Sequence, residues 1–233
     1  LSIRTLRIFH LNPIIIFTDQ ESLEDNTYSI LNSLKVEIIK IANLDPLDLF
    51  KYYLESPFKY TLALETDTFI QLEIDSVFKL LNRFDICYAN NPSRSTELHL
   101  NQIPSSLALP DTGVVGFRLN KRMNLFFKLC HSLMKKNNYK FKPGEALMEA
   151  VWNSNDIRPY ILPEEFCSRS KNMYNLGFSS KLNKLNYLKP KIHHMRLFNN
   201  FKNNNLHNKS IESHLKECNE ISMLELIRLF LKN

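Results

Sequence analysis

The stretch SPFKYTLALETDT, residues 56–68, decides how the rest of the chain is interpreted. Ser56-Pro57 ends a preceding helical pattern, because proline disfavours helical backbone in the residue before it. Residues 60–64 (YTLAL) then form a short apolar run of strand length. Two acidic residues, Glu65 and Asp67, follow directly. The stretch therefore predicts a buried strand that carries carboxylates at its carboxyl end.

Strand and helix patterns alternate on both sides of this stretch. The predicted strands are 13–18, 36–41, 60–64, 85–88, 113–118 and 157–162, and the predicted helices are 21–34, 45–54, 75–81, 120–136 and 146–152. Such alternation is typical of an α/β fold with an open, mostly parallel sheet flanked by helices. We expect the first three strands to lie side by side and parallel. Residues 90–110, rich in Asn, Pro and Ser, predict a long loop.

Composition narrows the class of protein. The 233 residues suffice for one α/β domain, and no apolar run is long enough for a membrane span. The four cysteines, Cys87, Cys130, Cys167 and Cys218, are far apart and form no Cys-x-x-Cys pair. This spacing favours separate thiols in a reducing compartment. With no leader pattern at Leu1, a cytoplasmic location is predicted.

The net charge of +6 suits a polyanionic partner such as nucleic acid, anionic lipid or a nucleotide diphosphate. The basic residues are spread along the chain, which is typical of a solvated basic face. The sequence also lacks RNA-binding and zinc-finger signatures, so nucleic acid is the weakest of these partners.

The two carboxylates after strand 60–64 could share one cation. Residues two apart on an extended segment point the same way, and ligands of open α/β sheets bind beyond the carboxyl ends of strands. Carboxylates suit hard cations such as Mg²⁺ and Mn²⁺. A cation held by Glu65 and Asp67 would neutralise a diphosphate. The alternative is an ordinary solvated loop end.

The same stretch resembles the metal-binding segment of GT-A glycosyltransferases of the glycogenin-like kind. Four later stretches resemble further segments of that family in the same order: DTGVVGFR (111–118), ALMEAVW (146–152), ILPEEF (161–166) and KIHH (191–194). The resemblance runs from about Leu1 to Arg196. It implies a GT-A-like (Rossmann-related) domain over residues 1–198 that lacks the family's first strand. An Asn-rich linker and an amphipathic helix are expected in 199–233.

The resemblance implies a glycosyltransferase that moves a sugar from a nucleotide-diphosphate donor to a sugar, protein or lipid acceptor. Its metal, Mn²⁺ or Mg²⁺, would be bound by the DxD-like Glu65-Thr66-Asp67 and by His193, with His194 as the alternative ligand. Asp111, Thr112 and Gly113 would lie beside the donor sugar. No residue stands out as a catalytic nucleophile, so the catalytic residues stay unassigned.

Five residues depart from the family pattern. Glu65 replaces an aspartate, Asp111 and Cys167 each replace an asparagine, and Pro143-Gly144 replaces an Asp-Gln pair. The changes at Asp111 and Pro143-Gly144 fall on the sugar side of the expected site rather than on the phosphate side. They favour altered sugar selectivity, or the alternative of a non-catalytic GT-A-like binding module.

Overall fold

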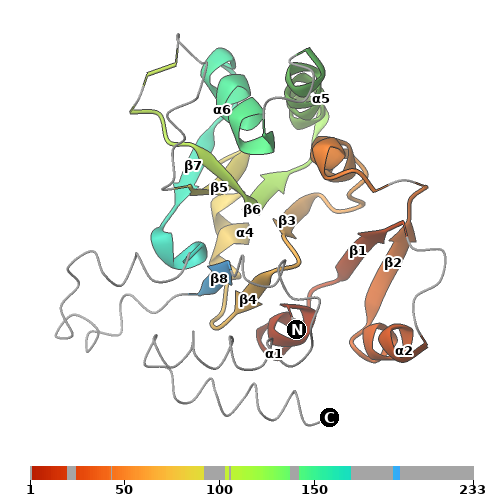
Figure 1. The fold of residues 1–233 in the computed structure, drawn as a ribbon. Helices are drawn as coiled ribbons and strands as arrows, with labels where there is room; N and C mark the ends of the chain where they lie inside the picture. Colours follow the sequence, from red (N-terminus) through yellow and green to blue (C-terminus); the bar gives the residue numbers. More distant parts are fainter. Residues whose placement is uncertain are drawn as a thin grey trace, which may run out of the picture.

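The computed structural model describes residues 2–19, 25–42, 44–91, 103–104, 106–136, 142–168 and 191–194 of the chain (Figure 1). Most of the predicted long loop, the linker and the predicted C-terminal helix lie outside these residues. Within the described part, no helix combines the length and the apolar character that crossing a membrane requires.

The main sheet has four strands in the order β3 (Tyr60–Leu64), β6 (Pro110–Arg118), β5 (Ile86–Asn90) and β7 (Pro159–Leu162). β6 is antiparallel to both β3 and β5, while β7 is parallel to β5. Three of the four strands therefore run in one direction, with β6 opposed to them. The α/β class with an open, mostly parallel sheet flanked by helices is confirmed.

A smaller parallel sheet precedes the main one. β1 (Ile14–Thr18) pairs in register with β2 (Val36–Lys40), and α2 (Asp25–Ser33) connects them. The expectation that 60–64 would join these two strands is wrong, since the hydrogen-bonded neighbour of β3 is β6. β6 lies between β3 and β5, and its nine residues reach along both.

Helices cover both faces of the main sheet (Figure 1). α3 (Leu49–Leu54), α5 (Lys121–Lys136) and α6 (Pro143–Asn153) pack with Ile86 and Tyr88 of β5 into one core cluster. α4 (Ser76–Leu80) packs with Cys87 and Ala89 on the other side. Side chains thus alternate along β5, and both sets are buried, as in a sheet between two layers.

Aromatic side chains fill the first of these clusters. Phe127 of α5 lies 5.0 Å from Phe117 of β6 and 5.3 Å from Tyr53 of α3, measured between ring centroids. Phe50 of α3 stacks on Phe127 at 6.1 Å. These edge-to-face and offset contacts fix how α3 and α5 sit on the sheet. η1 (Pro46–Asp48) precedes α3, and Asp45 caps it through the Leu47 amide, as the Asp45-Pro46 pair predicts.

The buried carboxylate of Asp85 links several elements at the end of the sheet where β5 begins. Asp85, fully buried, accepts hydrogen bonds from Arg118, Arg122 and Arg158 at 2.7–3.2 Å. Burial alone raises the pKa of Asp85, but hydrogen bonds from Arg158 and Arg118 and the charge of Arg122 together lower it to about 2. The carboxylate is therefore ionised and joins β5, β6, α5 and the start of β7.

Two very short strands complete the described fold. β4 (Thr68–Ile70) pairs antiparallel with β8 (Ile192–His194), and α1 (Ser2–Phe9) packs on β4. The hydroxyl of Thr5 on α1 accepts a hydrogen bond of 3.1 Å from the amide of Ile70. Neither strand was predicted, because three residues are too few to show a periodic pattern. Both are needed to shape the site described next.

Candidate metal centre

The predicted site lies at the edge of the main sheet where β3 ends and the opposed strand β6 begins. The amide of Glu65 donates to the carbonyl of Gly113 at 3.0 Å. This hydrogen bond continues the β3–β6 pairing by one residue and fixes the backbone of Glu65. The chain then turns, because the amide and hydroxyl of Thr68 both donate to the Glu65 carbonyl, at 3.2 and 2.8 Å. This turn directs Asp67 inward and leaves Thr66 exposed.

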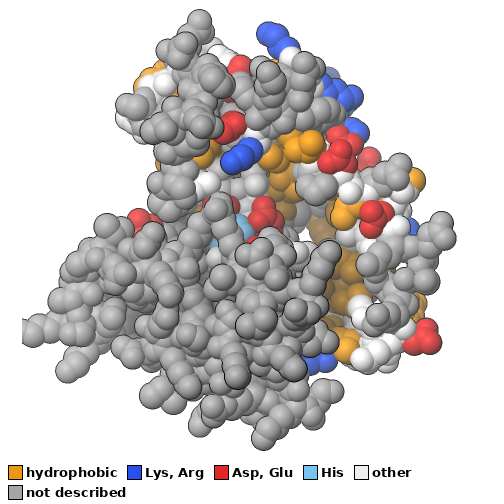
Figure 2. Space-filling model, viewed as in Figure 1, with side chains coloured by type: hydrophobic (Ala, Val, Ile, Leu, Met, Phe, Trp, Pro, Cys, Tyr) orange, Lys and Arg blue, Asp and Glu red, His pale blue; other side chains and the backbone are white. Residues whose placement is uncertain are grey.

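The two carboxylates differ in exposure. The Glu65 side chain is 43% exposed, whereas that of Asp67 is 6% exposed. The Asp67 carboxylate is thus held inside the protein, whereas solvent can reach the Glu65 carboxylate. Figure 2 shows acidic side chains beside a histidine in the middle of the viewed face.

The histidine that contacts both carboxylates is His194, the last residue of β8. Its register with Thr68 on β4 brings the imidazole over the turn. Nε2 lies 2.9 Å from Oε2 of Glu65 and 3.1 Å from Oδ1 of Asp67. The side chain of His193 is outside what the structure describes, so its role as ligand stays a prediction. His194, the alternative to it, meets both carboxylates.

The donor set fits a hard divalent cation. Ligands about 2.1 Å from an octahedral cation and at right angles to each other lie about 3.0 Å apart. The two contacts made by Nε2, at 2.9 and 3.1 Å, match that spacing. Two carboxylate oxygens and an imidazole nitrogen are also the donors that Mn²⁺ accepts. Glu65, Asp67 and His194 could therefore hold one such ion.

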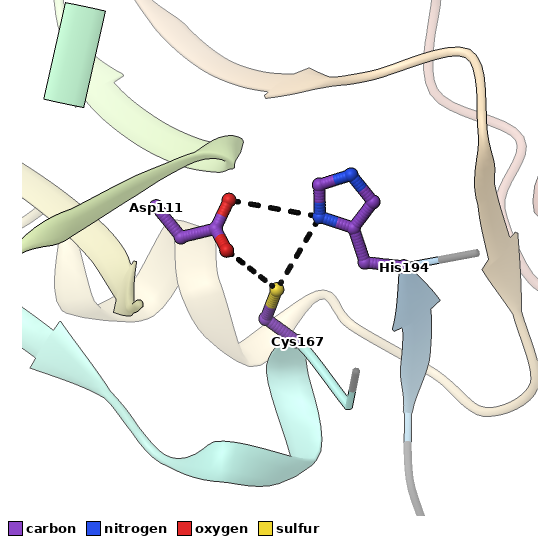
Figure 3. A group of neighbouring side chains, drawn as sticks. All are labelled: Asp111, Cys167 and His194. Atoms are coloured by element: carbon purple, nitrogen blue, oxygen red, sulfur yellow. Dashed lines mark hydrogen bonds and ion pairs between the residues drawn. The ribbon is translucent and has the colours of Figure 1, made fainter. Parts of the chain in front are cut away.

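A second group of side chains meets the other edge of the same imidazole (Figure 3). Nδ1 of His194 lies 3.6 Å from Oδ1 of Asp111 and 3.7 Å from Sγ of Cys167. The thiol of Cys167 donates to Oδ2 of Asp111 at 3.5 Å. All three side chains are buried, and they come from β6, from β8 and from the end of η2 (Glu164–Phe166).

The acidic surroundings favour the charged form of His194. Burial lowers the pKa of His194, but the Asp111 and Asp67 carboxylates, the Cys167 thiol and Glu65 outweigh it and raise that pKa well above its usual range. The same concentration of negative charge attracts a cation. Burial, then the charges of Glu65 and Asp111, also raise the pKa of Tyr53, which lies below this edge of the sheet and stays neutral.

The remaining predicted residues lie close to this centre. Oγ1 of Thr112 is 3.4 Å from Oε1 of Glu65, and the amide of Gly113 donates to Oδ1 of Asp111 at 2.9 Å. The Asp111 carboxylate is directed toward His194, and the ring of His194 lies so close to Gly113 that a Cβ there would be only 2.6 Å from Nδ1. Contact of Asp111, Thr112 and Gly113 with a sugar stays a prediction.

Solved structures show which fold this is. A galactosyltransferase, LgtC, solved with donor and acceptor sugar analogs, matches with TM-score 0.55 and 9% identity over 84% of this chain and 81% of its own. Mouse xyloside xylosyltransferase 1 matches with TM-score 0.55 and 12% identity over 83% of this chain and 89% of its own. The bifunctional glycosyltransferase WbbM matches with TM-score 0.54 and 14% identity over 82% of this chain and 42% of its own. The chain has the GT-A glycosyltransferase fold.

No protein-family model matches the sequence, and no curated protein matches it either. The GT-A fold therefore rests on the arrangement of elements rather than on sequence similarity. Identities of 9–14% show a shared fold and do not show what the candidate metal centre binds.

Sequence reasoning missed one association within the GT-A fold. Asp111 and Cys167, noted separately as departures from the family pattern, contact each other and the same imidazole. The only signal in the sequence was that both positions depart from the pattern. Residues 56 positions apart have no spacing rule that could have paired them.

Proposed function

We propose that this chain is a metal-dependent glycosyltransferase domain that uses a nucleotide-diphospho-sugar as donor. Mn²⁺ or Mg²⁺ would be held by Glu65, Asp67 and His194. The observation that supports this most is the convergence of these three donor atoms at the sheet edge of a GT-A fold. The domain would extend over residues 1–198, and its acceptor would be a sugar, a protein or a lipid.

The side chains around the cation would have different tasks. When bound, the cation would supply positive charge for the diphosphate of the donor and for the charge that develops on it as it leaves. Asp67 and His194, both nearly buried, would fix the position of that charge. Glu65, the more exposed of the carboxylates, faces solvent at the point where a diphosphate could approach. Thr112 lies beside Glu65 and could orient it.

A non-catalytic GT-A-like binding module is the second candidate. The observation that favours it is the orientation of Asp111, whose buried carboxylate contacts the Gly113 amide, Cys167 and His194. A carboxylate engaged in this way is poorly placed to meet a sugar hydroxyl. A module of this kind would keep cation-dependent nucleotide binding and lack transfer.

Calorimetry with the variant Asp67→Asn tests the cation site. Asparagine keeps the shape of the side chain and removes one negative ligand, so binding of a nucleotide-diphospho-sugar with Mn²⁺ should weaken by at least about tenfold. Asp156→Asn, at an exposed loop position before β7, is the matched control and should bind as the wild type does. Equal affinity with and without Mn²⁺ in all three proteins would contradict the proposed cation site.

A second measurement separates the two candidates. Wild-type protein with Mn²⁺ is incubated with a series of nucleotide-diphospho-sugars, and the released nucleoside diphosphate is measured. Release that depends on Mn²⁺ and falls in Asp67→Asn supports the transferase. Metal-dependent binding without release of diphosphate for any donor supports the binding module.

A further inference from the structure

The buried group behind the His194 imidazole has the composition of a second metal site. Asp111, Cys167 and His194 present a carboxylate, a thiol and a ring nitrogen, and one such atom from each lies within 4.8 Å of the others. His194 takes part through Nδ1, whereas the front cation site uses Nε2. Figure 3 shows the three side chains pointing toward a common centre.

The distance between His194 and Asp111 differs from that of a hydrogen bond, whereas the two sulfur contacts have hydrogen-bond lengths. At 3.6 Å, the separation of Nδ1 from Oδ1 of Asp111 exceeds the 2.7–3.2 Å range of N–H···O bonds. Sγ of Cys167 lies 3.7 Å from Nδ1 and 3.5 Å from the other carboxylate oxygen of Asp111, Oδ2. Each pair of side chains is thus 3.5–3.7 Å apart, with one oxygen of Asp111 facing Nδ1 and the other facing Sγ.

Those separations match the edges of a tetrahedral zinc site. Zinc binds sulfur at about 2.3 Å and nitrogen or oxygen at about 2.0–2.2 Å, which places tetrahedral ligands about 3.3–3.6 Å apart. The two separations that share Nδ1, 3.6 Å to Oδ1 of Asp111 and 3.7 Å to Sγ of Cys167, agree with these edges to within a few tenths of an ångström. A hard, octahedral ion would need shorter edges of about 3.0 Å, as found on the front side of the ring.

We infer that Asp111, Cys167 and Nδ1 of His194 form a site for a thiolate-binding metal ion of the zinc class. Thiolate and imidazole donors select Zn²⁺ and Co²⁺ over Mg²⁺ and Mn²⁺. Binding displaces two protons to solvent, one from the Cys167 thiol, which becomes a thiolate, and one from Nδ1 of the charged His194. Three protein ligands leave one tetrahedral position for water or another small ligand.

The shared histidine makes this site exclude the front cation. A neutral imidazole has one lone pair, on either Nδ1 or Nε2, and a proton on the other nitrogen. When zinc takes Nδ1, the proton lies on Nε2 and is directed at Glu65 and Asp67, 2.9 and 3.1 Å away. Mn²⁺ then loses its imidazole ligand. Zinc would therefore inhibit Mn²⁺ binding, a consequence that rests on the proposed function.

Cobalt spectroscopy tests the rear site without reference to activity. Co²⁺ bound to a thiolate absorbs strongly in the near ultraviolet, and we expect this band to saturate near one equivalent in the full chain. It should be absent in Cys167→Ala and present in Cys87→Ala, a matched loss of a thiol buried in the core. It should also persist in Asp67→Asn, which damages only the front site, so failure of the proposed function leaves this result unaffected.

Two further measurements need only wild-type protein, in case Cys167→Ala does not fold. Zinc X-ray absorption should show a sulfur neighbour at about 2.3 Å. One equivalent of Zn²⁺ should weaken Mn²⁺ binding at least about tenfold, the effect of losing one ligand. The inference is overturned if wild type shows no thiolate band and no sulfur neighbour, or if the band survives in Cys167→Ala. Unchanged Mn²⁺ affinity in zinc-loaded protein would overturn the exclusion.

Discussion

Replacing Gly113 with alanine tests whether the close approach of β6 to His194 positions the imidazole. An added Cβ would lie 2.6 Å from Nδ1 of His194 and 3.1 Å from Oδ1 of Asp111. Non-bonded atoms settle at about 3.5 Å or more, so the ring has to retreat by about 1 Å. The contacts of Nε2 with Glu65 and Asp67, now 2.9 and 3.1 Å, would be broken or distorted.

The cost of Gly113→Ala has two parts. Overpacking a buried position costs about 1–3 kcal/mol of unfolding free energy. Alanine also lowers the conformational entropy of the unfolded chain, which stabilises the folded protein by about 0.4–1 kcal/mol. This gain applies because Gly113 lies within a β-strand and needs no left-handed backbone. The net expected loss is about 1–2 kcal/mol. Affinity for Mn²⁺ should fall at least about tenfold, as it does when the support of a ligand is lost.

The assay pairs thermal unfolding with calorimetric Mn²⁺ titration, and Gly116→Ala is the control. Gly116 is on the same strand, and its added Cβ would meet Cγ1 of Val77 at 2.8 Å, in the core rather than at the centre. Gly116→Ala should therefore lose stability but keep wild-type Mn²⁺ affinity. Wild-type affinity in Gly113→Ala, or an equal loss in both variants, would refute the reasoning.

Three further changes have defined outcomes. Asp85→Asn leaves three guanidinium groups without their carboxylate and should cost about 3 kcal/mol in chemical unfolding. In the wild type, the lowered pKa of Asp85, about 2 against the usual 3.8, contributes about 2 kcal/mol. That stability is present above about pH 4 and is lost as the pH falls through 2. The unfolding free energy of the wild type should therefore fall more steeply with decreasing pH than that of Asp85→Asn, and equal slopes in an acid-unfolding series would contradict this role. Gly144→Ala would place a Cβ against the carbonyl oxygen of Pro110 and should lower the melting temperature by several degrees, without changing Mn²⁺ affinity. Glu65→Gln should weaken Mn²⁺ binding. It should leave the melting temperature of the metal-free protein nearly unchanged, because the Glu65 side chain is 43% exposed. A large drop in that melting temperature would mean that Glu65 is structural.

Local patterns predicted most of the elements correctly. The predicted strands 13–18, 36–41 and 60–64 are observed as β1, β2 and β3. The predicted helix 120–136, with its regularly spaced apolar residues, is observed as α5 (Lys121–Lys136). These elements bury a face with a clear period, so their own residues determine them. The predicted strand 113–118 begins three residues earlier, at Pro110, because pairing with β5 extends it.

Contacts between distant residues could not be predicted in the same way. The pairing of β6 with β3 depends on strand order, which hydrophobic periodicity does not encode. Choosing between His193 and His194 required the register of β8 against β4, where a shift of one residue exchanges the two side chains. The contact between Asp111 and Cys167 likewise exists only once β6 and η2 are in place.

The place of β6 between β3 and β5 also bears on how the chain reaches its native state. β3 and β5 are both complete by Asn90, but the strand that joins them begins only at Pro110. During synthesis from the N-terminus, both strands therefore expose unpaired edges until β6 has left the ribosome. Exposed edges recruit other chains, so this interval is when the nascent protein is most prone to aggregate. A ribosome that pauses after β5 has emerged and before β6 has emerged would prolong that interval, and chaperone binding should be greatest then.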